Sequence, residues 1–109
     1  MKKLIIISIA LSALTASTGR AADAKATYEA QCAKCHGKDG KGDTKMGQKL
    51  GAKDYSSAKA QDEMKDEAAF KAIKEGLKDK DGKVLMKPTE GVSDQEIKEL
   101  VAYMRSFKK

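Results

Sequence analysis

The sequence is poor in the residues that usually hold a small fold together. It contains no tryptophan, one proline, one histidine and two cysteines, and 5% of its 109 residues are aromatic while 35% are charged. These Cys and His side chains are too few for a structural zinc site, which needs about four ligands. Because a domain this small and this short of apolar material usually needs a disulfide, a metal or a cofactor, we expect a group other than polypeptide to complete the core.

The N-terminus has the three-part layout of a secretory signal peptide. Met1–Lys3 is positively charged, Leu4–Ala16 is apolar, and Ser17–Ala21 is more polar and ends in small residues. The apolar run is shorter than the roughly 20 residues that a membrane-spanning helix needs. We therefore predict cleavage after Ala21 and export to the periplasm, with residues 22–109 forming one domain that has no membrane span.

The charge that remains after this cleavage is modest. The predicted signal peptide carries three basic residues and no acidic ones, so its removal lowers the net charge from +6 to +3. The remaining charges alternate in sign along the chain, which is typical of a well-solvated surface. We therefore expect no nucleic-acid partner.

Three helical patterns predict an all-α fold. The first covers about residues 22–33, and the second covers residues 66–75, with Gly76 as a natural C-terminal stop. The third begins with a capping box formed by Ser93 and Glu96. Its apolar residues follow at helical spacing and are Ile97, Leu100, Val101, Met104 and Phe107. No stretch shows the alternation that is typical of a strand.

Long irregular segments are expected between these helices. Residues 37–51 contain five glycines, and residues 78–92 contain the turn signal Asp81-Gly82 and the only proline, Pro88. Such long irregular stretches are uncommon in so small a domain unless they wrap a ligand. The organisation of the chain therefore favours a bound group between the helices.

The segment Cys32-Ala33-Lys34-Cys35-His36 has the C-x-x-C-H spacing of a haem attachment motif. Two thiols on one helical turn can reach the two vinyl groups of a single haem and form thioethers with them. The histidine that directly follows then lies beneath the iron as an axial ligand. We therefore predict one covalently attached haem c, held by Cys32, Cys35 and His36.

Other uses of the cysteine pair fit the sequence less well. A thioredoxin-like redox pair follows a strand in a βαβ unit, whereas the flanks here are helical or rich in glycine. A disulfide across so short a loop would stabilise the chain little. Because His36 is the only histidine, the chain can bind at most one such haem, and bis-histidine ligation within the chain is excluded.

The sixth position on the iron requires a methionine, another weak ligand or an open site. Met104 belongs to the apolar face of the last helix and is better explained as core, and Met46 lies too soon after His36 to reach the opposite haem face. Met64, just before the second helix, stays an alternative. Met86 is preferred, because it lies fifty residues after His36 in an irregular segment that can cross the far side of the haem.

The predicted mature chain resembles, over essentially its whole length, the class I mono-haem cytochrome c family of small bacterial proteins. The segments that carry the resemblance are Tyr28, Cys32–Gly37, Asp39–Asp43, Phe70–Gly76, Met86, Val92–Ile97 and Leu100–Arg105. Two positions depart from the family pattern. Gln48 follows Gly47 where the family often has proline, and Lys87 separates Met86 from Pro88.

The resemblance implies an all-α cytochrome c fold in which three main helices and long loops surround one haem. In this family the first and last helices cross, which would place Tyr28 near residues 100–103. The middle helix and the methionine loop close the haem crevice. The resemblance also implies His36 and Met86 as axial ligands and the transfer of single electrons.

Eight lysines flank the two loops that are expected around the mouth of the haem crevice. They are Lys34, Lys38, Lys41, Lys45, Lys49, Lys53, Lys83 and Lys87. Each one alone is explained by solubility. Together they favour docking onto an acidic patch of a redox partner.

The sequence predicts a monomeric periplasmic electron carrier rather than an enzyme, because no residues suggest general acid or base chemistry on a substrate. Two alternatives stay open. The chain is equally suited to be the haem c subunit of a larger oxidoreductase, and a labile sixth site would instead make it a ligand-binding or sensing haem protein.

Overall fold

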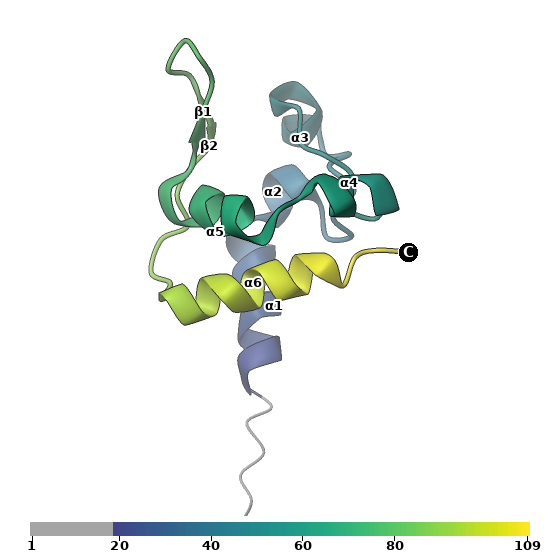
Figure 1. Cartoon of the computed structure of the whole chain (residues 1–109), viewed down its shortest axis with the longest axis vertical. Coiled ribbons are helices and arrows are strands. Elements are labelled where there is room, and N and C mark those ends of the chain that lie inside the picture. Colours follow the sequence, from purple (N-terminus) through teal and green to yellow (C-terminus); the bar gives the residue numbers. More distant parts are fainter. Residues whose placement is uncertain (1–18) are drawn as a thin grey trace, which may run out of the picture.

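The computed structural model describes residues 19–109, and in this part of the chain most of the ordered structure is helical (Figure 1). The elements are α1 Gly19–Gln31, α2 Ala33–His36, α3 Lys45–Leu50, α4 Ala58–Glu63, α5 Asp66–Glu75, β1 Leu77–Lys78, β2 Val84–Met86 and α6 Asp94–Arg105. This content confirms the predicted all-α class. Residues 1–18 of the predicted signal peptide lie outside the described residues, and cleavage after Ala21 stays a prediction.

The helices that the sequence defines most sharply are α5 and α6. As predicted, α5 runs from Asp66 to Glu75, and Gly76 ends it with φ +79°, a conformation that favours glycine. At the start of α6, the Ser93 hydroxyl accepts a hydrogen bond from the Glu96 backbone N–H at 3.1 Å, and the Glu96 carboxylate accepts one from the Ser93 N–H at 3.3 Å. This confirms the predicted capping box.

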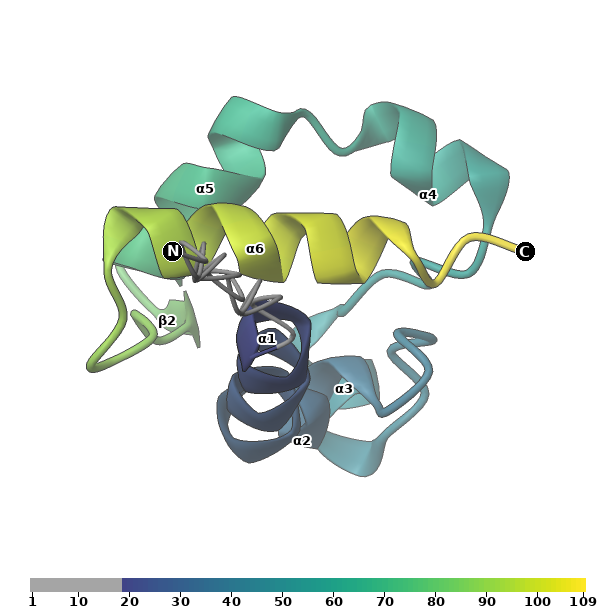
Figure 2. The same cartoon turned by 90° about the horizontal axis from the view of Figure 1, so that it is seen from below.

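The helices α1 and α6 cross at the centre of the fold. Figure 2 shows α6 passing across α1, with α4 and α5 on the other side of α6. Tyr28 of α1 is fully buried, and its ring centroid lies 5.2 Å from that of Tyr103 and 5.1 Å from that of Phe107. Such aromatic pairs add to the stability gained from burial. The crossing that the family resemblance implied is therefore present.

The hydrophobic core surrounds this crossing and extends to α5. Apart from Tyr28 and Cys32, its buried members are aliphatic or sulfur-containing side chains. They are Ala24, Ala69, Ile73, Ile97, Leu100, Val101 and Met104. All the predicted apolar positions of α6 up to Met104 are buried, and Phe107, just beyond the helix, packs against the core.

The segment between the first two predicted helices is more ordered than expected. It contains two short helices, α3 and α4, and the expectation of a purely irregular loop was wrong. Each begins at a capping hydroxyl, because Thr44 accepts a hydrogen bond from the Gly47 N–H at 2.9 Å and Ser57 accepts one from the Ala60 N–H at 3.1 Å. Helices of one or two turns are too short to show a helical hydrophobic period, so the sequence pattern did not reveal them.

The expectation of no strand was also wrong. β1 and β2 form a small antiparallel hairpin with Leu77 opposite Met86 and Lys78 opposite Val84. The Asp79 carboxylate accepts hydrogen bonds from the backbone N–H groups of Asp81 and Lys83, each at 2.9 Å, and so organises the turn. Strands of two and three residues cannot display the alternation by which a strand is recognised.

Within residues 19–109, none of the helices combines the length and the apolar character needed to cross a membrane.

Candidate haem site

The two cysteines and the histidine lie on one turn, in which Cys32 joins α1 to α2 and α2 itself carries Cys35 and His36. The backbone N–H groups of Cys35 and His36 both donate to the Cys32 carbonyl, at 3.2 and 3.0 Å. Both thiols are free. Cys32 is buried in the core, where burial and the neighbouring Cys35 raise the pKa of its thiol to about 11, whereas Cys35 is half-buried. The turn therefore presents two thiols and an imidazole together.

His36 lines a mostly apolar cleft, and burial lowers the pKa of its imidazole. The ring is therefore neutral at neutral pH, which is the form that binds a metal. Its Nδ1 atom is buried and has no hydrogen-bond partner within residues 19–109. A buried polar atom of this kind is unusual in a native structure.

The helix α3 packs against the attachment turn. A Cβ atom built on Gly47 would lie 2.1 Å from the Cys35 carbonyl oxygen, so only glycine allows α3 to pack this closely on α2. The Thr44 hydroxyl also donates to the attachment turn. It lies 2.8 Å from the Lys34 carbonyl oxygen and 3.0 Å from the Cys35 carbonyl oxygen. Sequence reasoning noted Gly47 but missed Thr44, whose position as a helix N-cap was the available signal.

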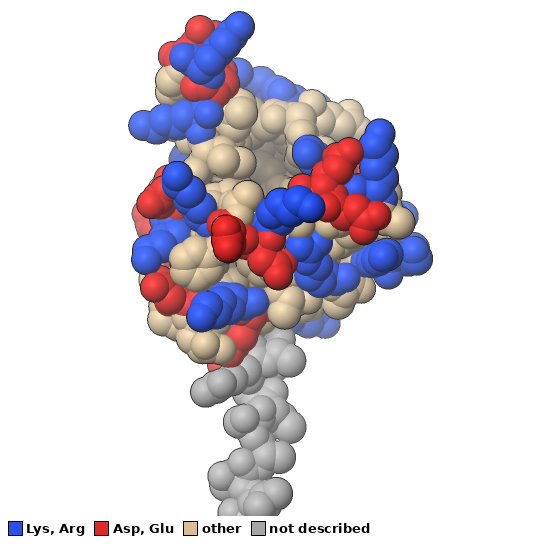
Figure 3. All heavy atoms as spheres, viewed as in Figure 1, with Lys and Arg blue, Asp and Glu red and all other residues tan. Residues whose placement is uncertain are grey.

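The cleft beside His36 has a volume of about 260 Å³ and mostly apolar walls. Its lining residues are His36, Lys53, Tyr55, Glu63, Met64, Lys65, Ala68, Ala69, Ala72, Ile73, Leu77, Met86 and Met104. Figure 3 shows this face of the molecule. It is hollowed between the β1–β2 hairpin and the part that carries α3 and α4 in Figure 1, with uncharged residues in the hollow and charged side chains around it. The cleft can therefore accommodate an apolar group whose edge reaches solvent.

Three of the methionines considered as ligands line this cleft together with His36. They are Met64, Met86 and Met104. Met46 does not line the cleft and is 37% exposed on α3. Met104 is also buried in the core, as expected. The structure thus brings the preferred Met86 into the cleft that His36 lines, but it places the alternative Met64 in that cleft too.

The backbone of Met86 is fixed by its neighbours on α5 and β1. Met86 ends β2 opposite Leu77, and a Cβ atom on Gly76 would lie 2.5 Å from the Met86 carbonyl oxygen. Beyond Pro88, the Thr89 N–H donates to the Ile73 carbonyl at 2.8 Å. The end of α5 therefore supports the methionine segment, which comprises residues 86–90.

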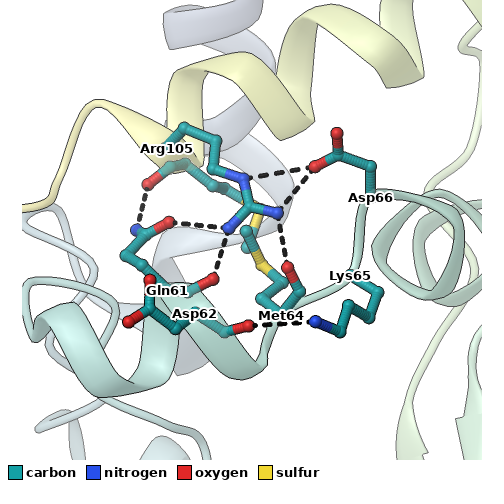
Figure 4. Close-up of polar contacts among 7 residues, drawn as sticks. Gln61, Asp62, Met64, Lys65, Asp66 and Arg105 are labelled. Atoms are coloured by element: carbon teal, nitrogen blue, oxygen red, sulfur yellow. Dashed lines mark hydrogen bonds and ion pairs between the residues drawn. The ribbon is translucent and has the colours of Figure 1, made fainter.

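The backbone of Met64 is held by Arg105, near the end of α6 (Figure 4). The Arg105 guanidinium donates to the carbonyl of Met64, to the carbonyl of Gln61 at 2.5 Å, and to the carboxylate of Asp66 at 2.6 Å. Gln61 is itself buried, and its amide donates to the carbonyl of Met104 at 2.9 Å. Arg105 and Gln61 thereby join the wall between α4 and α5 to α6.

Sequence reasoning missed Gln61 as a structural residue and used Arg105 only as part of the family resemblance. It also missed Tyr55, which lines the cleft with its ring centroid 5.8 Å from that of His36. Burial raises the pKa of the Tyr55 hydroxyl. Nothing in the local pattern marks these residues, because their partners lie far away along the chain.

Comparison with known proteins identifies the family. Residues 19–104 match the family described as cytochrome C oxidase, cbb3-type, subunit III. The chain belongs to this cytochrome c family. A solved structure of the KustC0563 c-type cytochrome is 34% identical to this cytochrome, with a TM-score of 0.66, covering 79% of this chain and 98% of that one. A tyrosine-to-phenylalanine mutant of Kustc0563 is 33% identical, with a TM-score of 0.64 and coverage of 79% and 99%. No curated protein matches the chain.

The residues of this cytochrome fit the haem c that its family implies. The attachment turn offers two free thiols, and the cleft beside it is mostly apolar. The same cleft contains a neutral imidazole and thioether sulfurs, which are the ligand types that hold the iron in cytochromes c. As a cytochrome c, the protein binds haem c and takes part in electron transfer.

Proposed function

We propose that this cytochrome is a periplasmic electron carrier with a single haem c, attached through Cys32 and Cys35 and ligated by His36 and Met86. It is not an enzyme in its own right. The observation that carries the proposal is that His36 and Met86 line one mostly apolar cleft although they are fifty residues apart in the sequence. A bound haem supplies an iron that gains and loses one electron, and a thioether ligand favours its reduced state.

For electron transfer, the protein supplies an uncharged imidazole and a rigid backbone around the site. Burial keeps His36 uncharged, and the contact of Gly47 with Cys35 fixes the attachment turn. The segment that carries Met86 is supported by Gly76 and Ile73. Because both ligands come from constrained backbone, little needs to reorganise when the charge at the site changes.

Met86 is favoured over the other two methionines of the cleft. Met104 lies in the last turn of α6 and fills the core. The Met64 backbone is hydrogen-bonded to Arg105 in a contact that joins α4 and α5 to α6. Met86 ends a strand and leads into a loop. Its position suits a side chain that approaches the cleft from the side opposite the attachment turn.

The axial ligand can be tested with the absorption spectrum of the oxidised protein. Met86→Leu should lose the charge-transfer band of a methionine–iron bond, whereas Met64→Leu should retain it. Ferrous wild type should bind carbon monoxide poorly, and Met86→Leu should bind it readily. Retention of the band in Met86→Leu with its loss in Met64→Leu would assign the ligand to Met64 instead.

A second candidate function is that of a haem c subunit in an oxidase or another oxidoreductase. The observation that favours it is the matched family, whose description names an oxidase subunit. Affinity purification of the tagged protein from its native membranes and periplasm separates the two. A carrier is recovered as a monomer from the periplasmic fraction, and a subunit is recovered with stoichiometric partners. A sensing function is tested by the carbon monoxide measurement, because a labile sixth site would bind the gas in wild type.

Docking of the carrier is proposed to use the lysines around the cleft. All eight of the lysines that the sequence analysis singled out are exposed. Lys53 also lines the cleft itself. We expect the partner to present an acidic surface to this face.

A further inference from the structure

The side chain of Gln31 pairs with the backbone of the segment that follows Met86. Its Nε2 atom donates to the Glu90 carbonyl at 3.0 Å, and its Oε1 atom accepts from the Glu90 N–H at 3.0 Å. A primary amide that uses both of its functions on one residue reproduces the pairing of two peptide groups in a sheet. The two residues are 59 positions apart in the sequence, so this contact is a tertiary link.

The Gln31 link ties this segment to a different element from those that its other hydrogen bonds reach. The pairing of Met86 with Leu77 and the hydrogen bond from Thr89 to Ile73 lead back to β1 and α5. The Gln31 contact leads to α1, whose last residue is Gln31 itself and which directly precedes Cys32. It therefore connects the methionine segment to the part of the chain that holds the haem on the histidine side.

We propose that Gln31 is a positioning residue that keeps Met86 in place as the sixth ligand. The proposal rests on the proposed function, in which Met86 is that ligand. The distance between the attachment turn and the methionine segment determines whether the Met86 sulfur stays within bonding reach. Gln31 fixes that distance with two hydrogen bonds, and without them the segment opens more often while its ends on α5 and α6 stay folded.

Substitution of Gln31 by alanine removes both hydrogen bonds without disturbing the helix. Gln31 is exposed, it ends α1, and alanine is a strong helix former. A competing ligand can occupy the iron only when Met86 has left, so its apparent affinity follows the population of the open segment. The loss of two exposed hydrogen bonds should raise that affinity by about tenfold.

The experiment is an imidazole titration of the oxidised holoprotein, followed by absorbance. Gln31→Ala should bind imidazole about tenfold more tightly than wild type. Gln31→Glu should also bind it more tightly, because a carboxylate oxygen would face the Glu90 carbonyl where the amide N–H now donates. Glu90→Ala is the matched control and should behave as wild type, because both hydrogen bonds of Gln31 are made with the backbone of Glu90. Exchange of the Glu90 amide proton should be faster in Gln31→Ala.

A double-mutant comparison separates this inference from the assignment of Met86. In Met86→Ala, imidazole should bind tightly, and the added Gln31→Ala change should have no further effect. If Met86→Ala leaves the imidazole affinity unchanged, the ligand assignment itself fails. If Met86→Ala raises the affinity but Gln31→Ala does not, the ligand assignment stands and the positioning role of Gln31 is wrong. A lower unfolding midpoint in Gln31→Ala with unchanged imidazole affinity would show a merely structural role.

Discussion

The Tyr28 hydroxyl donates a hydrogen bond of 2.7 Å to the Gly37 carbonyl, which belongs to the residue immediately after His36. The same ring is fully buried between Tyr103 and Phe107 at the crossing of α1 and α6. One side chain therefore joins the helix crossing to the attachment turn. The geometry of the haem site depends in this way on the packing of the two terminal helices.

This bond predicts a specific alkaline instability. Burial raises the pKa of Tyr28 well above its ordinary value of 10.0, so the folded state keeps a proton that the unfolded chain releases. The stability from this group is complete below about pH 10 and declines as the pH rises further, by up to about 1.4 kcal/mol per pH unit. Tyr28→Phe should lose about 1 kcal/mol at neutral pH, because it removes one of the two hydrogen bonds that the Gly37 carbonyl accepts, the other coming from the Gly40 N–H at 3.1 Å. It should also show a weaker alkaline decline.

Urea unfolding at neutral pH and at about pH 11 measures both effects. Tyr103→Phe is the control, because it leaves the Tyr28 hydroxyl in place and should keep the wild-type alkaline decline. An equally steep decline in Tyr28→Phe would contradict the role assigned to Tyr28.

The close packing of α3 on α2 predicts that Gly47→Ala is strongly destabilising. The new methyl group would overlap the Cys35 carbonyl, and backbone cannot move aside as a flexible side chain does. We expect a loss of about 3 kcal/mol and a smaller fraction of protein with covalent haem. Denaturant unfolding measures the loss of stability, and haem staining of the denatured protein measures the fraction with covalent haem. The exposed Lys49→Ala on the same helix should change stability by less than about 0.5 kcal/mol, and a similar loss in both variants would refute the packing argument.

We predict that the hydrogen bonds from Arg105 to the carbonyls of Gln61 and Met64 stabilise the fold more than its ion pair with Asp66 does. Arg105→Lys keeps the charge but cannot bind the carbonyls of Gln61 and Met64 together with Asp66, so it should cost about 2–3 kcal/mol. Asp66→Asn should cost at most about 1 kcal/mol, because the Asp66 side chain is 76% exposed. The midpoints of urea unfolding compare the two variants. The prediction fails if Asp66→Asn is as damaging as Arg105→Lys.

The lysine surface predicts an ionic-strength dependence of electron transfer. The second-order rate with an acidic redox protein should fall as salt is added. Combined charge reversal at Lys49 and Lys87 should lower that rate about tenfold at low salt and have little effect at high salt. Stopped-flow oxidation measures it, with Lys25→Glu on α1 as the control. A rate that does not respond to ionic strength would rule out electrostatic docking by these lysines.

Local chemistry made much of this protein predictable from its sequence. The capping box of Ser93 and Glu96, the stop at Gly76 and the spacing of Cys32, Cys35 and His36 depend on neighbours within a few residues. Such patterns express themselves in the same way in almost any fold. The limits of α5 and the start of α6 were therefore predicted correctly, whereas α3, α4 and the hairpin were missed because each is shorter than the period that would reveal it.

What the sequence determined by itself is the attachment turn, the main helices and the need for a group to complete a small core. Only the tertiary structure decided which methionines reach the cleft of His36 and how their backbones are held. The Gln31–Glu90 pair, the Arg105 junction and the contact of Gly76 with Met86 join positions that are distant in the chain or are defined by close approach. These contacts exist only after the helices have packed, since packing and not local preference brings such groups within hydrogen-bonding distance.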